Sequence, residues 1–200
     1  MRELIATTFL TLDGVMQAPG GPGEDTDAGF AYGGWSATLW DDRMGEVMGG
    51  IMGKPFDLVL GRKTYDIFAG FWPNAPEEAG GKPLNDATKY VASRGRPELT
   101  WDRSVLIEGD AAEGVAQLKQ DDGPELQVHG SGNLLQTLIR HNLVDRFYLW
   151  VFPVLIGTGK RLFADGVIPS ALKLVDNVVS TTGVVIGTYE PAGDIVLGSF

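Results

Sequence analysis

A glycine-rich turn between a strand and a helix is the feature that most constrains how this chain can fold. Residues 129–134 read His-Gly-Ser-Gly-Asn-Leu, after a short run of strand type at 125–128. Apolar residues then recur at helical spacing, at Leu134, Leu135, Leu138 and Ile139. The glycines permit positive φ, and the first N–H groups of the helix point outward unpaired, which suits a phosphate. The simpler interpretation is a tight turn in which Ser131 only caps the helix.

Segments of strand type and of helix type alternate along most of the chain. The expected strands are residues 4–12, 56–60, 89–93, 104–108, 125–128, 146–155, 172–179 and 184–189. One helix is expected to start at Ser36 as its N-cap and to bury apolar positions as far as Ile51, and others cover 64–71 and 111–119. We therefore predict one α/β domain over residues 1–200, with a mostly parallel central sheet, flanking helices and an antiparallel C-terminal edge.

Three motifs follow directly after expected strands. They come after Leu60, after Ala92 and after Val128, and each carries glycine, hydroxyl or basic residues. Ligands of such sheets bind outside the carboxyl ends of the parallel strands. The shared placement of the three motifs therefore predicts one binding site at that edge.

Composition narrows the classes of function. The chain has 16 basic and 26 acidic residues, a net charge of −10, which argues against nucleic-acid binding. With no cysteine, two histidines and no close carboxylate cluster, no metal site is expected. The N-terminus lacks the pattern of a signal peptide, and the longest apolar run, 147–156, contains Pro153 and is too short for a bilayer. We expect a cytoplasmic protein with no membrane partner.

Several motifs, in this order, resemble the dihydrofolate-reductase-like superfamily. They are residues 11–14 (Thr-Leu-Asp-Gly), 60–66 (Leu-Gly-Arg-Lys-Thr-Tyr-Asp), 71–73 (Phe-Trp-Pro), 89–93 (Lys-Tyr-Val-Ala-Ser), 130–132 (Gly-Ser-Gly), 143–145 (Leu-Val-Asp) and 153–163 (Pro-Val-Leu-Ile-Gly-Thr-Gly-Lys-Arg-Leu-Phe). The closer resemblance is to the branch related to the C-terminal reductase domain of bacterial riboflavin biosynthesis. It extends over nearly the whole chain.

This resemblance implies an NADPH-binding dihydrofolate-reductase-like fold, a small-molecule substrate and a homodimer. The residues that match the cofactor motifs are Gly61, Arg62, Lys63 and Thr64 for the pyrophosphate and adenosine phosphate, Ser93 and Arg94 for the ribose 2′-phosphate, and Gly130, Ser131, Gly132, Asn133 and Leu134 for the diphosphate. A guanidinium beside a hydroxyl suits a dianionic phosphate. The alternative for each arginine is an ordinary surface salt bridge.

The resemblance also points to two catalytic candidates, Asp13 and Asp41. Asp13 ends the first strand, where the family places an acid near the substrate, although Asp-Gly is also a common turn pair. Asp41 lies where folate reductases carry a substrate-binding carboxylate, although it also fits a solvated helix start. The Leu-Pro-Trp approach of the folate enzymes is missing here, which argues against dihydrofolate. The loop at 17–35 is expected to close over the substrate, and Phe30, Tyr32, Trp35 and Trp40 are candidates for stacking on it or for burial under the loop.

The leading hypothesis is an NADPH-dependent reductase of a small flat heterocycle, pterin-like or riboflavin-precursor-like. The alternative is an NADP-binding protein of the same fold without turnover. A weaker third hypothesis is a structural or partner-binding domain whose cleft takes no cofactor. Cofactor binding and NADPH oxidation distinguish the three.

Overall fold

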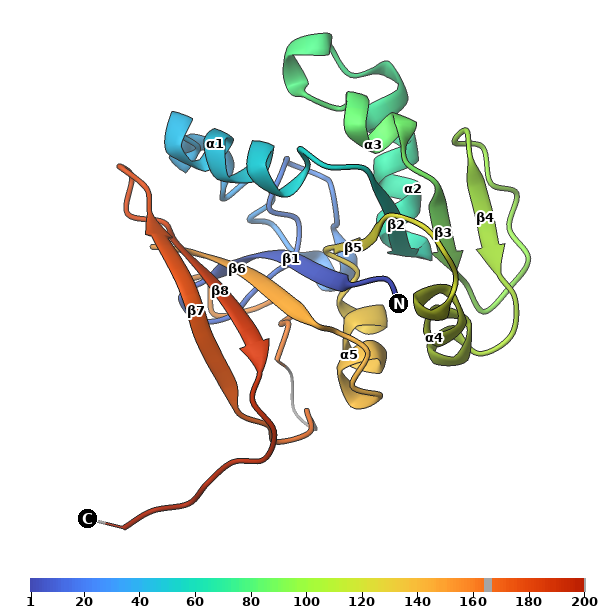
Figure 1. Cartoon of the computed structure of the whole chain (residues 1–200). Coiled ribbons are helices and arrows are strands. Elements are labelled where there is room, and N and C mark those ends of the chain that lie inside the picture. Colours follow the sequence, from blue (N-terminus) through green and yellow to red (C-terminus); the bar gives the residue numbers. More distant parts are fainter. Residues whose placement is uncertain (164–166, 200) are drawn as a thin grey trace.

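A single eight-stranded sheet organises the computed structural model, which describes residues 1–163 and 167–199 (Figure 1). Its strands lie in the order β4-β3-β2-β5-β1-β6-β8-β7. Their bounds are β1 Leu4–Thr11, β2 Phe56–Gly61, β3 Lys89–Ala92, β4 Ser104–Ile107, β5 Glu125–His129, β6 Arg146–Phe152, β7 Leu172–Val179 and β8 Val185–Pro191. The first six strands pair in parallel, and only the β6–β8 and β7–β8 pairings are antiparallel among the named strands. The predicted α/β class and its antiparallel C-terminal edge are confirmed.

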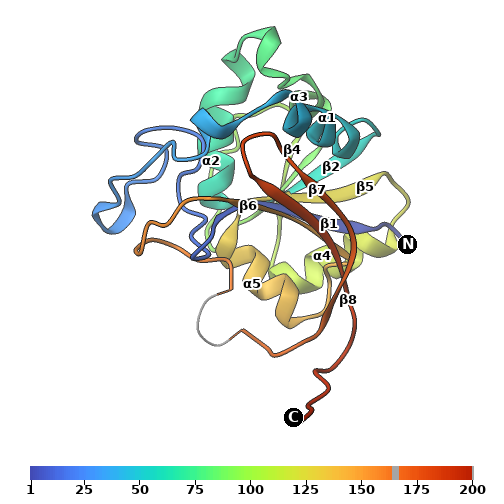
Figure 2. The same ribbon diagram turned by 90° about the vertical axis from the view of Figure 1, so that its left-hand side faces the viewer.

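Helices cover both faces of the parallel part of the sheet (Figure 2). They are α1 Asp42–Ile51, α2 Arg62–Phe71, α3 Lys82–Asp86, α4 Ala111–Gln120 and α5 Gly132–Arg140, with 3-10 turns at Asp27–Gly29, Ala37–Leu39, Trp72–Asn74 and Glu77–Ala79. Helices α4 and α5 pack on one face, and α1, α2 and α3 pack on the other. Because central strands are covered twice, β2 is an almost continuous apolar run rather than an alternating one.

The sheet brings the three predicted motifs to one edge. Strands β3, β2 and β5 are neighbours and run parallel, so their carboxyl ends point the same way. Ser93 follows β3, Gly61 ends β2 and starts α2, and Gly130 follows β5. The predicted convergence of these motifs is therefore present in the fold.

Two element boundaries differ from those that the sequence predicts. Ser36 precedes only a short 3-10 turn, and its hydroxyl donates to the carbonyl of Pro19 instead of capping a helix. Helix α1 begins at Asp42, because the carboxylate of Asp41 accepts the N–H of Met44 at 2.9 Å and so serves as the N-cap. Strand β6 stops at Phe152, since Pro153 has no N–H to donate to a ladder.

Candidate functional site

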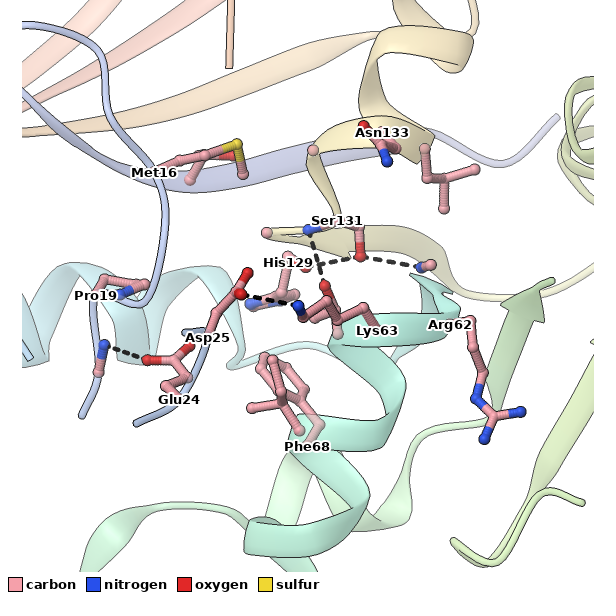
Figure 3. A pocket seen from close by; sticks show the side chains of 18 of the residues that line it. Met16, Pro19, Glu24, Asp25, Arg62, Lys63, Phe68, His129, Ser131 and Asn133 are labelled. Carbon is pink, nitrogen blue, oxygen red and sulfur yellow. Dashed lines mark hydrogen bonds and ion pairs between the residues drawn. The ribbon is translucent and has the colours of Figure 1, made fainter. Parts of the chain in front are cut away.

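A cavity of about 1270 Å³ lies at the carboxyl edge of the parallel strands (Figure 3). It exceeds the roughly 300–1,000 Å³ typical of a site for one drug-sized molecule. Every residue predicted for the cofactor lines it: Gly61, Arg62, Lys63, Thr64, Ser93, Arg94, Gly130, Ser131, Gly132, Asn133 and Leu134. Residues from three separate stretches of sequence thus share one wall of one cavity.

The two glycine turns of this wall are tied together by hydrogen bonds. The hydroxyl of Ser131 accepts the N–H of Gly61 at 3.0 Å, and the N–H of Ser131 donates to the hydroxyl of Thr64 at 3.1 Å. Gly130 and Ser131 have φ values of 59° and 53°, in the left-handed region that glycine takes easily and serine rarely. The Ser131 hydroxyl makes no helix cap, so the simpler interpretation of the turn is wrong on that point. It couples the start of α5 to the start of α2.

Helix α5 offers unpaired donors to the cavity. The N–H groups of Gly132, Asn133 and Leu134 have no hydrogen-bond partner within residues 1–163 and 167–199, as expected for a first helical turn. Among the residues that the structure describes, Thr8 Oγ1 and Gln136 Nε2 are buried from solvent and also lack a partner, and both residues line this cavity. The open start of α5 is therefore the feature of this wall that suits an anion.

Four of the five basic residues that line the cavity are already paired. Arg62 Nε bonds to the Asp66 carboxylate at 2.7 Å, on the exposed side of α2, and Arg161 lies 3.5 Å from Asp13. Lys63 and Lys160 pair with acids of the 17–35 loop. For Arg62 the surface salt bridge that the sequence left open is thus present.

Arg94 is the exception. Its exposed side chain has no ion pair or hydrogen bond with any residue that the structure describes, although it lines the cavity. Beside it, the hydroxyl of Ser93 accepts only the N–H of Gly95, at 3.3 Å, and keeps its own proton to donate. The two residues therefore leave a guanidinium and a hydroxyl available for an anion.

Two lysines and two aspartates hold the 17–35 loop against the body. Lys63 lies 2.8 Å from Asp25 and also pairs with Asp27, and Lys160 lies 2.6 Å from Asp25 and 2.7 Å from Asp27. Hydrogen bonds from Lys160 and Lys63 lower the pKa of Asp27 to about 2. Gln17 adds bonds of 3.1 Å to the carbonyls of Asp25 and Asp27 and accepts the N–H of Lys160 at 3.0 Å. We call these four charged residues the loop clamp.

The far part of the cavity is apolar and aromatic. It is lined by Phe9, Trp40, Met48, Met52, Ile67, Phe68, Phe71, Trp72 and Leu84. Trp40 is 43% exposed and stacks on the buried Trp150, with ring centroids 6.0 Å apart and planes 10° apart. Of the four aromatic candidates from the sequence, only Trp40 lines the cavity. Phe30 is buried, Tyr32 is exposed and packs edge-on against Phe30, and Trp35 packs edge-on against Phe152. Flat rings suit such a wall.

The two predicted catalytic acids are placed outside the cavity lining. Asp13 accepts the Thr11 hydroxyl at 2.6 Å and the N–H of Gly157 at 2.7 Å, and the Thr11 bond leads in lowering its pKa to about 2. Asp41 caps α1 and accepts from Thr181, whose hydroxyl bond lowers the pKa of Asp41. Both acids serve as turn or cap residues, the alternatives that the sequence allowed. Their placement does not favour a role at the reacting end.

Some residues of the wall carry no sequence signal of their own. Glu24 and Asp25 read as ordinary loop charges, and Thr8 reads as a strand residue. Lys160 lies in the 153–163 motif, but no role was predicted for it. His129 ends β5, and its Nε2 lies 3.0 Å from Gln127 Oε1. Burial lowers the pKa of His129 to about 4. A neutral imidazole thus lines the cavity at neutral pH.

The described ranges contain neither a candidate metal cluster nor a helix that could span a membrane. No group of three or more histidine or acidic side chains with metal-ligand spacing occurs in residues 1–163 and 167–199. In the same ranges, no helix is long and apolar enough to cross a bilayer.

Comparison with known proteins identifies relatives over nearly the whole chain. A family model described as the RibD C-terminal domain matches residues 2–186. The uncharacterized protein YyaP of Bacillus subtilis (strain 168) is 29% identical over 198 residues, 94% of this chain and 95% of the relative. YwjB of the same organism, also uncharacterized, is 29% identical over 109 residues, 54% of this chain and 58% of the relative.

Two solved structures share the fold. A protein provisionally described as a riboflavin biosynthesis protein, from Shewanella sp. PV-4, has a TM-score of 0.72 at 20% identity and covers 95% of this chain and 99% of its own. A pyrimidine reductase-like protein from Corynebacterium diphtheriae has a TM-score of 0.64 at 13% identity, covering 96% and 93%. At these identities the likeness shows the fold alone.

Proposed function

The chain belongs to the RibD C-terminal domain family, and from this premise we propose that it is an NADPH-dependent reductase of a small flat heterocycle. The substrate class is pterin-like or riboflavin-precursor-like. The observation that carries the proposal is the convergence of an unpaired Arg94, the open start of α5 and an aromatic wall on one cavity.

The donor set fits a dinucleotide that carries an additional phosphate. Free N–H groups at a helix start suit a diphosphate, because the helix dipole and the unpaired donors both favour negative charge. Arg94 and Ser93, at the end of β3, suit the 2′-phosphate that distinguishes NADPH from NADH.

Lys63 has a different part in this proposal from Arg94. Although partial burial opposes its charge, bonds to Asp25 and Asp27 raise the pKa of Lys63. Its ammonium is therefore charged and shared with the loop, and a phosphate would have to compete with two carboxylates for it. We assign the direct 2′-phosphate contact to Arg94 and a longer-range electrostatic contribution to Lys63.

When bound, NADPH supplies the hydride, and the protein supplies binding, orientation and exclusion of water. The turns coupled by Ser131 fix the starts of α2 and α5, and hence the donors that would position the diphosphate. The clamped loop narrows access from water. Trp40 and its neighbours form the surface on which a flat substrate ring would stack.

The experiment that tests the reductase proposal measures NADPH oxidation with panels of pterins, flavin precursors and quinones. Consumption of NADPH with stoichiometric reduction of one panel member supports it. Tight NADPH binding without oxidation across the panels favours the alternative, a binding protein without turnover. Absence of binding by NADPH contradicts both.

A further inference from the structure

Glu24 is a carboxylate of the cavity for which the proposed cofactor site provides no role. Acidic residues that line the cavity are Glu24, Asp25 and Asp110. Asp25 belongs to the loop clamp, with bonds to Lys63 and Lys160. Asp110 is the N-cap of α4 and accepts two backbone N–H groups, at 2.9 and 3.0 Å. Both bonds go to Oδ1 of Asp110, so Glu24 and Asp110 each keep one oxygen uncommitted within residues 1–163 and 167–199. Asp110 follows β4, which neighbours the β3 end that carries Ser93 and Arg94, whereas Glu24 belongs to the loop after β1.

The side chain of Glu24 is held in a defined orientation. Its Oε2 accepts the N–H of Gly20 at 2.6 Å and the N–H of Gly21 at 3.1 Å. Its Oε1 has no hydrogen-bond or ion-pair partner among the residues that the structure describes. Burial raises the pKa of Glu24, and no cation pairs with it there. One oxygen is thus fixed to the loop, and the other is left without a donor.

The loop clamp fixes the backbone that carries this carboxylate. Asp25 follows Glu24 directly and is bonded to Lys63 on α2 (Figure 3). It is also bonded to Lys160, beyond β6. Because Lys63 and Lys160 both hold Asp25, the position of Glu24 does not depend on the loop alone. Such external support is what gives a recognition group its precision.

We infer that Glu24 is the substrate-recognition residue of this cavity, whose free oxygen receives an N–H edge of a flat nitrogen heterocycle stacked on the aromatic wall. The inference rests on the proposed function. Under this inference Glu24 takes the place of Asp13 and Asp41 as the acid that contacts the substrate, since neither aspartate lines the cavity. An apolar site strengthens a hydrogen bond to a carboxylate and penalises ligands that leave the carboxylate unpaired. Ligands without an N–H donor are therefore disfavoured.

The test compares two probes that differ in this donor edge. Aminobenzimidazole is a flat bicycle with adjacent N–H donors, and N-methylindole is a flat bicycle of similar size with none. Each is titrated into the NADPH-saturated protein, followed by tryptophan fluorescence, in the wild type, Glu24→Gln and Glu46→Gln. Glutamine keeps an acceptor oxygen for the Gly20 and Gly21 N–H groups, so the loop is retained. Glu46, exposed on α1 and paired with Arg43, provides the control.

The expected result is a tenfold or greater loss of aminobenzimidazole affinity in Glu24→Gln only, with N-methylindole affinity unchanged. Equal aminobenzimidazole affinity in the wild type and Glu24→Gln would overturn the inference. A wild type that binds NADPH but does not bind aminobenzimidazole would overturn it too. If NADPH itself fails to bind, the proposed function fails. The probes are then titrated without NADPH, and the comparison of aminobenzimidazole affinity between the wild type and Glu24→Gln tests the role of Glu24 separately.

Discussion

Removing the Ser131 hydroxyl is expected to destabilise the protein and to loosen the cofactor wall together. Ser131→Ala deletes the acceptor of the Gly61 N–H, whose bond is 3.0 Å long, in a side chain that is only 8% exposed. Leaving a buried donor unsatisfied costs about 1–3 kcal/mol, compared with about 1 kcal/mol for a typical hydrogen bond. We therefore expect the free energy of unfolding to fall by about 1–3 kcal/mol.

Urea unfolding followed by tryptophan fluorescence measures this loss. Ser93→Ala is the matched control, because the Ser93 hydroxyl accepts a single bond of 3.3 Å and is expected to change stability by less than about 0.5 kcal/mol. Thr64→Ser keeps the hydroxyl that accepts the Ser131 N–H and should stay near the wild type, whereas Thr64→Ala should not. If Ser131→Ala is as stable as Ser93→Ala, the coupling between the two turns carries no stability and the reasoning is refuted.

Two further predictions follow from the structure, and a third follows from the family resemblance. The pKa of His129 is about 4 in the folded chain and about 6.5 when unfolded, so the unfolded state binds more protons between these values. Stability should then fall by about 1–3 kcal/mol as the pH is lowered through that window, and His129→Gln should flatten this slope in pH-dependent urea unfolding. Asp25→Asn with Asp27→Asn removes the four clamp ion pairs, so chymotrypsin should cut the 17–35 loop several-fold faster, while an unchanged rate would show that the clamp does not hold the loop. The predicted homodimer should give twice the chain mass by light scattering at micromolar concentration, and a single monomer peak would refute it.

The fold was largely predictable because its signals are local and agree with one another. Alternating strand and helix segments, with glycine turns between them, led to a parallel sheet with an antiparallel edge, as found. The start of α1 was misplaced because Ser36 and Asp41 are both good caps, and the choice between them depends on Pro19 and Thr181, which lie far away in sequence.

The cavity wall that carries the residues predicted for the cofactor was predictable for a different reason. Its residues follow strands directly, so the sheet topology alone brings Gly61, Arg94 and Gly130 to the same edge. Which basic residues of this wall are unpaired depends on tertiary contacts. Lys63 is paired with the loop and Arg94 is unpaired among the described residues, and nothing in their local sequence distinguishes them.

The acidic residues around the cavity were the least predictable part. Asp13 and Asp41 were proposed from their positions along the chain, but their carboxylates are turned to backbone N–H groups and threonine hydroxyls. Glu24 lies in a glycine-rich loop without hydrophobic periodicity, so its sequence does not predict where its side chain points. Its position depends on bonds from the Gly20 and Gly21 N–H groups and on the ion pairs that its neighbour Asp25 forms with distant lysines.

The ratio of NADPH to NADH affinity, measured in the wild type and in Arg94→Ala, tests the central claim most directly. Tryptophan fluorescence reports binding, because Trp40 and Trp72 line the cavity. Loss of a charged 2′-phosphate contact should cost about 1.5–3 kcal/mol, roughly tenfold or more in affinity for NADPH. The account predicts that the wild type prefers NADPH and that Arg94→Ala removes the preference while NADH affinity is unchanged. Equal affinity for the two dinucleotides in the wild type, or binding of neither, would contradict it.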